Sequence, residues 1–323
     1  VSQPLTLLPT DARGENTIGS GATVTVSLSV TATQDLLKRV PAVYRTQIND
    51  VLIAALAQTI GEWTGESSLY LHLEGHGREE LFDDVDISRT VGWFTTMFPV
   101  SLHWSEGDGE GALLKKIKEQ LRQVPNKGIG YGILRYLQQS HSLVDRPTPA
   151  ISFNYLGQFD QTLSAESDFQ LASESAGAES NSQGRRQHLL DISGSIVGGQ
   201  LHLSWTYSSN LHQPETIERL AHRLLERLTA TIDHCMEPTA GGYTPSDFPL
   251  AQLSQLELDR IVDNDRRSVV DIYPLSPMQQ GMLFHSLYAP ESGVYVELVQ
   301  CTLQGNLNID VFCKLGNWVI GSL

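Results

Sequence analysis

The feature that most constrains the fold is a change of hydrophobic period between residues 47–63 and residues 68–74. In the first segment apolar residues recur at steps of three and four, which predicts an amphipathic helix. In the second they recur at every other position, with leucines on one face and polar side chains, Glu74 among them, on the other. A helix followed so closely by a half-buried strand predicts an α/β fold of two or more layers.

The same two periods recur along most of the chain. Strands are predicted over residues 23–31, 150–155, 189–197 and 200–207, and helices over residues 112–123 and 214–234. Residues 161–187 are rich in Ser, Ala, Glu and Gly without a sustained period, which predicts a mobile loop. Residues 237–249 are rich in proline and glycine, which indicates an inter-domain linker, and a short helix is predicted at 250–263.

Charge and composition exclude several classes of function. The net charge is −15, and no cluster of Lys and Arg offers the phosphate contacts that nucleic acid or an anionic membrane would need. No apolar run approaches the roughly 20 residues that span a bilayer, and no signal pattern opens the sequence. We therefore expect a soluble, cytoplasmic protein. The three cysteines are far apart and are expected to be reduced thiols.

Five short segments have a distinctive composition and order. They are Asn49–Leu56, Glu74–Glu79, Ser88–Thr95 with Phe98 and Pro99 after it, Val124–Gly132 and Phe153–Asp160. Each resembles a signature block of the epimerization domains of nonribosomal peptide synthetases. One such block could arise by chance, but five in the family's order are specific. The resemblance covers roughly residues 20–240.

A second resemblance begins in the segment Tyr273–His285, which is similar to the first motif of a condensation domain. Its sequence is similar to that of the condensation-domain subclass that follows an epimerization domain and accepts a D-configured donor. The two resemblances imply the C-terminal part of an epimerization domain at 1–236, a linker at 237–270 and a truncated start of a condensation domain at 271–323. The family's paired-histidine motif, HHxxxDG, does not occur in the sequence, and the residues after about Asp310 depart from the family pattern.

The resemblance also implies a fold and an activity. The fold class is α/β, with a chloramphenicol acetyltransferase-like lobe and the start of a second such domain. The parent enzyme is expected to epimerize an aminoacyl or peptidyl thioester, with no directly bound cofactor. A neighbouring peptidyl carrier domain would supply the 4'-phosphopantetheine arm, and adjacent synthetase modules would be the other partners. The fragment alone is expected to be inactive. Two alternatives are a condensation domain that forms amide bonds and a non-catalytic docking module.

Inversion at an amino-acid Cα requires proton removal from one face and proton return to the other, together with donors for the enolate oxygen. Glu74 is the best candidate base, because it ends a strand and is followed by Gly75 and Gly77, which let the backbone approach a substrate. Partial burial would raise its pKa into a useful range. The resemblance implies the same assignment. The alternative is a solvated carboxylate, or an ion-pair partner of Arg78 or Arg89.

Other candidates surround this carboxylate in the sequence. His76 lies between two glycines and could act in catalysis or simply hydrogen-bond a turn. The hydroxyl of Tyr155 could stabilise an enolate or belong to a core tyrosine, and Asn154 is a possible donor to the substrate. Three further residues could line the substrate tunnel, although packing and an internal ion pair are the commoner roles of such a block: Arg89, Thr90 and Trp93.

Overall fold

The structure, a computed structural model, describes residues 7–158, 177, 180–262, 267–290, 302, 304–305, 308–312 and 314. It divides into two compact units, Val1–Ile272 and Tyr273–Leu323. Of the loop predicted at 161–187, residues 161–176 and 178–179 lie outside the described residues. No helix among the described residues combines the length and the apolar content that crossing a bilayer requires.

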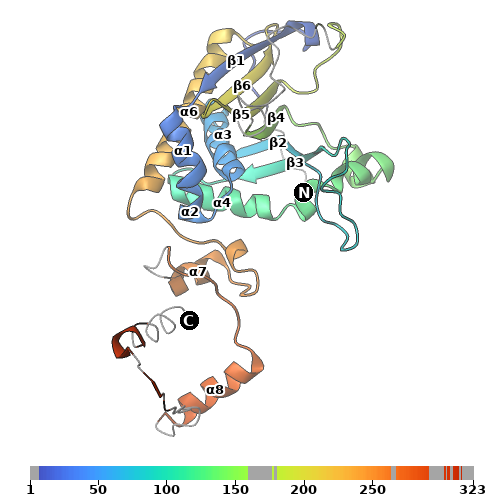
Figure 1. Ribbon diagram of the computed structural model, residues 1–323. Helices are drawn as coiled ribbons and strands as arrows, with labels where there is room; N and C mark the ends of the chain where they lie inside the picture. Colours follow the sequence, from blue (N-terminus) through green and yellow to red (C-terminus); the bar gives the residue numbers. More distant parts are fainter. Residues whose placement is uncertain are drawn as a thin grey trace. The chain divides into compact units, whose positions relative to one another are not determined.

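The first unit is built on a six-stranded sheet with the order β1-β6-β5-β4-β2-β3 (Figure 1). β2 is parallel to β4 and β4 is parallel to β5, whereas the other neighbours are antiparallel. The strands are β1 (Gly21–Ser27), β2 (Ser68–Gly75), β3 (Thr96–His103), β4 (Ile151–Gln158), β5 (Leu190–Val197) and β6 (Gln200–Ser208). The mixed α/β architecture predicted from the two hydrophobic periods is confirmed.

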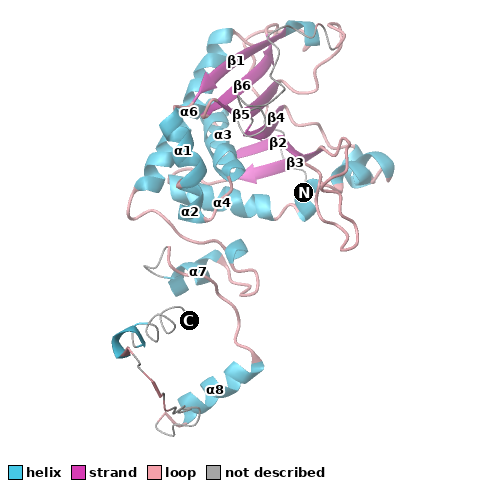
Figure 2. Ribbon diagram, in the orientation of Figure 1, coloured by secondary structure: helices cyan, strands magenta, loops and turns pink. Residues whose placement is uncertain are grey.

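A layer of helices lies on one side of this sheet (Figure 2). They are α1 (Val30–Lys38), α2 (Val40–Tyr44), α3 (Ile48–Thr64), α4 (Glu110–Arg122) and α6 (Pro214–Met236). α3 packs against both β2 and α6, and every residue from Asp50 to Ala57 is buried. The helix predicted at 47–63 is therefore present, but it is covered nearly all round instead of being amphipathic.

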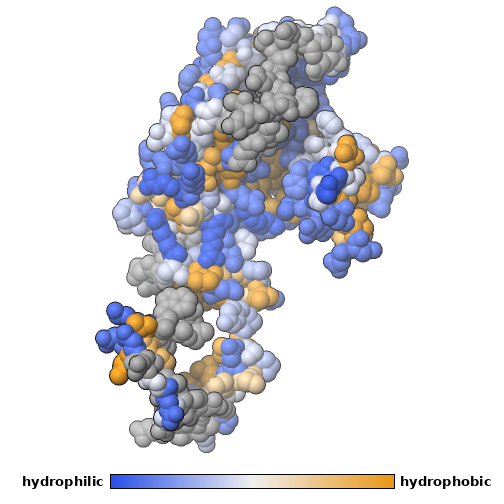
Figure 3. Space-filling view, viewed as in Figure 1, coloured by the Kyte–Doolittle hydropathy of each residue, from blue (hydrophilic) through white to orange (hydrophobic). Residues whose placement is uncertain are grey.

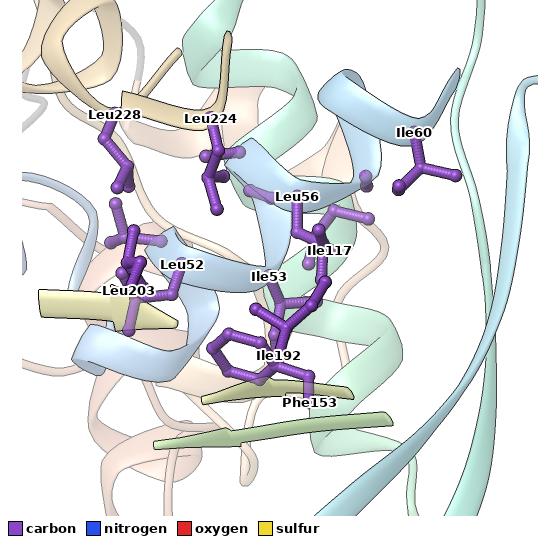
Figure 4. Packing of buried hydrophobic residues seen from close by; sticks show 14 of the residues in the cluster. Leu52, Ile53, Leu56, Ile60, Ile117, Phe153, Ile192, Leu203, Leu224 and Leu228 are labelled. Atoms are coloured by element: carbon purple, nitrogen blue, oxygen red, sulfur yellow. The ribbon is translucent and has the colours of Figure 1, made fainter. Parts of the chain in front are cut away.

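The core lies between the sheet and these helices (Figure 4). Aliphatic side chains of α3 meet those of α4 and α6 on one side and apolar side chains of three strands on the other. The residues labelled there are Leu52, Ile53, Leu56, Ile60, Ile117, Phe153, Ile192, Leu203, Leu224 and Leu228. Burial of each such side chain contributes roughly 1.5–3 kcal/mol before the loss of conformational entropy. This core fixes the strands that carry the polar residues described below.

Two boundaries differ from the sequence prediction for local reasons. The strand predicted at 23–31 ends at Ser27, because the hydroxyl of Ser29 accepts the N–H of Ala32 over 3.2 Å and caps α1. β3 was not predicted, because Pro99 stands inside it. β3 is the edge strand of the sheet, a position at which a strand can contain a proline.

The segment predicted as an inter-domain linker, 237–270, belongs to the first unit. It contains η5 (Pro245–Asp247) and α7 (Gln255–Val262), and its own small apolar cluster includes Tyr243 and Phe248. The buried ammonium of Lys118 on α4 donates to both carboxylate oxygens of Asp247, over 2.6 and 2.8 Å. This ion pair fastens the segment to the helical layer.

The second unit contains α8 (Pro277–Tyr288). The hydroxyl of Ser276 accepts the N–H of Gln279, and the Gln279 side chain in turn accepts the N–H of Ser276, which is a reciprocal capping box. No residue of α8 is buried, and the Met278, Leu287 and Tyr288 side chains are largely exposed.

Candidate active site

Glu74 is the penultimate residue of β2 and lines a cavity of about 400 Å³. The cavity is bounded by the C-terminal ends of β2 and β4, the start of α3, the end of α4 and the turn at η2 (Pro125–Gly128). Its lining residues with polar side chains are Gln47, Asn49, Asp50, Glu74, His76, Glu79, Arg122, Lys127 and Tyr155. The predicted candidates Glu74, His76 and Tyr155 therefore meet in one cavity.

The carboxylate of Glu74 is held by a neutral partner. Nδ2 of Asn154 on β4 donates to Oε2 of Glu74 over 2.6 Å. Burial raises the pKa of Glu74, the negative charge of Asp191 raises it further, and the charge of His188 opposes both. The ion pairs to Arg78 or Arg89 considered as alternatives are not among the contacts of the described residues. Glu74 is thus a partly buried carboxylate without a cationic partner in that part of the chain.

Tyr155 follows Asn154 on β4 and is half-buried at the same cavity. Burial raises the pKa of its phenol, so the hydroxyl keeps its proton at neutral pH and can donate a hydrogen bond. Glu74 and Tyr155 both line this cavity, but Glu74 is level with Asn154 on the paired strand, so the Tyr155 side chain leaves the sheet on the other face.

His76 makes the turn contact that was considered as its alternative role. Its Nδ1 accepts the backbone N–H of Arg78 over 3.0 Å, and its Nε2 lies 3.2 Å from Oε1 of Glu79. Glu79 is also paired with Lys127 over 2.8 Å. The His76 ring lines the cavity while it is tied to its own turn.

Arg89, Thr90 and Trp93 lie on the irregular segment between β2 and β3, outside the residues that line the cavity. The Trp93 side chain is 91% exposed. The segment is held by Arg78, which donates to the carbonyl oxygens of Ile87 and Thr90 and stacks over the ring of Phe94 at 4.2 Å. Figure 3 shows apolar surface on the projecting part of the lobe that includes this segment.

An ion pair that was not singled out from the sequence borders the cavity. Arg122 at the end of α4 donates to both oxygens of Asp50 over 2.9 and 2.6 Å. Asp50 also accepts the N–H of Gln47, which caps α3. Asp50 belongs to the first of the five sequence blocks, but nothing in the local pattern pointed to Arg122 as its partner. The pair fixes the helix ends that form one wall.

A buried histidine pair lies beside the site. Nδ1 of His72 on β2 is 2.9 Å from Nε2 of His188, and Nδ1 of His188 is 2.9 Å from Oδ1 of Asp191. Both rings are almost fully buried. From the sequence, His72 was only one of the polar residues on its strand face. The described residues contain no group of three or more His, Cys, Asp or Glu side chains arranged to hold a metal ion.

Comparison with known proteins places these features in a family. The condensation-domain family profile matches residues 2–254. A linear gramicidin synthase protein of Brevibacillus parabrevis is 49% identical over 302 residues, which cover 92% of this chain and 4% of that protein. Bacitracin synthase 3 of Bacillus licheniformis is 37% identical over 297 residues, covering 92% and 5% respectively. This chain thus spans only a small part of these relatives.

Among solved structures, the epimerization domain from the third module of tyrocidine synthetase B is similar, with 36% identity and a TM-score of 0.66. The match covers 73% of this chain and 53% of that domain. The predicted fold class, an α/β chloramphenicol acetyltransferase-like lobe of the condensation and epimerization type, is therefore confirmed.

Proposed function

This chain belongs to the condensation-domain family of nonribosomal peptide synthetases, and we propose on that basis that its first unit is the C-terminal lobe of an epimerization domain. The observation that carries the proposal is the position of Glu74, a partly buried carboxylate that lines a cavity beside Tyr155 and accepts the amide of Asn154. The likeness to the epimerization domain of tyrocidine synthetase B supports the same activity. Residues 271–323 would begin the downstream condensation domain.

The proposed substrate is an aminoacyl or peptidyl thioester on the 4'-phosphopantetheine arm of a carrier domain. Glu74 takes the Cα proton, and the electron pair of the broken C–H bond moves onto the thioester carbonyl oxygen. Tyr155, which remains protonated, is the donor proposed for that oxygen. Return of a proton to the opposite face restores the C–H bond with inverted configuration. The thioester carbonyl makes the Cα proton acidic enough for a carboxylate whose pKa is raised.

The second proton transfer needs an acid on the other face of the substrate. The HHxxxDG motif, which the family resemblance assigns to the acid–base machinery, does not occur in these 323 residues. We therefore propose that the chain alone does not epimerize. This can be tested by incubating it with a carrier-bound substrate labelled with tritium at Cα. Release of the label at the rate of an intact epimerization domain would contradict the proposal.

The role of Glu74 is tested in the intact parent module. Glu74→Gln preserves the size of the side chain and removes the base, and we expect α-hydrogen exchange to fall on the order of 10²–10⁴-fold. The matched control is Glu66→Gln, which changes an exposed carboxylate after the end of α3 and should leave exchange unchanged. Equal exchange in both variants would remove Glu74 from the reaction.

The family profile describes a condensation domain, so amide formation is the second candidate function. The two functions differ in their products. An epimerase returns the same thioester with D and L configurations, whereas a condensation domain consumes two thioesters and forms a new amide bond. Chiral chromatography of the amino acid released from the carrier, together with mass spectrometry of the carrier-bound chain, separates them. A docking module would bind the carrier without either product.

A further inference from the structure

A second polar row crosses the sheet directly beside the row that contains Glu74. His72 is opposite Ser152, and Ser152 is opposite Asp191, so these three side chains share one row across β2, β4 and β5. Because alternate residues of a strand point to the same face, this row lies on the face of Glu74 and Asn154. The spacing between the two rows is about 7 Å, two residues along a strand.

The centre of this row is the carboxylate of Asp191. Its Oδ1 accepts a hydrogen bond of 2.5 Å from the Ser152 hydroxyl and lies 2.9 Å from Nδ1 of His188. Its Oδ2 accepts a bond of 2.7 Å from Arg186. Both oxygens of Asp191 are therefore occupied, and its orientation is fixed from three directions.

Asp191 is the acidic member of this row, and its contact with Arg186 is an ion pair of 2.7 Å. Burial alone would raise the pKa of Asp191, but the hydrogen bonds from His188 and Ser152 and the charges of His188 and Arg186 lower it below its usual value. Burial, followed by the effect of His188, lowers the pKa of His72 to about 4, so His72 is neutral at neutral pH. The charge of Arg135 acts on His72 in the same direction.

We propose that Asp191 is a positioning residue for the Glu74 base. Its carboxylate, fixed by Ser152, His188 and Arg186 one row from Glu74, makes Glu74 a stronger base than burial alone would. The inference rests on the proposed function and extends it to a residue that lies outside both the cavity lining and the five sequence blocks. Asp191 acts through its negative charge, which disfavours the ionised form of Glu74.

Other charged groups set the background of this effect. Besides Asp191 and His188, His72 lies on the same face of β2 as Glu74, and the cavity that Glu74 lines contains further titratable or charged residues: Asp50, His76, Glu79, Arg122, Lys127 and Tyr155. The Asp191 side chain retains 39% of its surface exposed, so water screens part of its charge. The shift is therefore expected to be modest and must be measured on Glu74 itself.

The direct test is a pH titration of the Glu74 carboxyl carbon by NMR in the 323-residue chain, with ¹³C-labelled glutamate assigned through Glu74→Gln. Asp191→Asn retains the size of the side chain and removes the charge, so the Glu74 midpoint is expected to move to lower pH. The control is Asp108→Asn, which removes a carboxylate paired with Lys116 and should not move it. An unchanged or higher midpoint in folded Asp191→Asn would overturn the proposal.

A second variant should shift the Glu74 midpoint in the opposite direction, and it tests the proposal if Asp191→Asn does not fold. Arg186→Gln removes the cation that partly neutralises Asp191, so the Glu74 midpoint should move to higher pH. A purely structural role of Asp191, joining β4 to β5, would lower stability in both variants without opposite shifts of Glu74. Shifts in the same direction would therefore also overturn the proposal.

Activity provides an independent readout in the intact parent module. In Asp191→Asn the acid limb of the pH profile for α-hydrogen exchange should move to lower pH, and the plateau should fall on the order of threefold because a weaker base removes the proton more slowly. If exchange survives Glu74→Gln, the proposed function fails, while the NMR titration still tests the coupling of Asp191 to Glu74. If exchange requires Glu74 but its profile is unmoved by Asp191→Asn, only the present inference fails.

Discussion

Asn154 and Glu74 join two parallel strands at the candidate site through a hydrogen bond of 2.6 Å, from Nδ2 of Asn154 to Oε2 of Glu74. A neutral amide orients the carboxylate without stabilising its charge as a cation would. Asp50 illustrates the other arrangement, because Arg122 pairs with both of its oxygens at the wall of the same cavity. Arg122 thus neutralises Asp50 and Lys127 neutralises Glu79, whereas Glu74 remains available to accept a proton.

This arrangement predicts that Glu74 lowers the stability of the lobe at neutral pH. Burial raises the folded-state pKa of Glu74 above its unfolded value, so any stability that the group contributes is present below the unfolded pKa and lost as pH rises through the folded one. Glu74→Gln should therefore raise the Tm at pH 7. The gain should vanish near pH 3, well below the unfolded pKa of about 4.3, where Glu74 is protonated in both states. Scanning calorimetry at the two pH values measures this, and a lower Tm at pH 7 would contradict it.

The lowered pKa of His72 predicts that the lobe loses stability in acid. The His72 pKa is lowered to about 4 in the folded state, against about 6.5 when unfolded, so its contribution is present above pH 6.5 and lost as pH falls toward 4. The full loss is roughly 3 kcal/mol at most. His72→Gln should flatten the fall in unfolding free energy over this range, measured by urea denaturation. His212, whose pKa burial also lowers, should account for part of the remaining slope.

Sequence patterns predicted the helices and strands that have one buried face. They did not predict side-chain contacts between residues that are far apart in the sequence. β2 was predicted because its leucines alternate, whereas the burial of His72 on its polar face depends on His188, 116 positions away. Asp50 was part of a predicted helix, but its pairing with Arg122 depends on how α4 packs beside α3. The cavity was anticipated at Glu74 and Tyr155, because both lie at the ends of predicted strands.

The buried ion pair of Lys118 and Asp247 predicts a large and local effect. Its side chains are 2% and 7% exposed, and the Lys118 ammonium also donates to the carbonyl oxygen of Tyr44. Asp247→Ala leaves a buried ammonium without its counterion and should lower the free energy of unfolding by about 3–5 kcal/mol. Amide hydrogen exchange should show the loss first in residues 240–262.

The control for this prediction is Asp108→Ala, which breaks a more exposed pair with Lys116 and should cost less than about 1 kcal/mol. Equal costs for the two substitutions, or uniform loss of protection across the lobe, would show that the pair does not fasten this segment.

A side chain added at Gly77 should disturb the segment between β2 and β3 by steric conflict. The φ of Gly77 is +65°, and an added Cβ would lie 1.6 Å from the carbonyl oxygen of Phe94. Gly77→Ala must therefore displace residues 77–94 from the end of β2. We expect faster proteolysis of this segment and a lower Tm.

Gly107→Ala is the matched control, because Gly107 also has a positive φ, +83°, but open space around its Cβ position. It should carry only the backbone strain of a non-glycine residue in this conformation, about 1 kcal/mol. If both variants behave alike, the contact with Phe94 has no role.

The pairing of β1 with β6 has a consequence for how the lobe is made. Thr23 and Thr206 hydrogen-bond to each other although they are 183 positions apart. At a translation rate of about 5–20 residues per second, β1 leaves the ribosome roughly 10 to 40 s before its partner strand. During that interval the nascent strand has an unpaired edge, and the threonines at alternate positions on one of its faces limit its attraction to other chains. The lobe can therefore complete its sheet only late in synthesis, after β6 has left the ribosome.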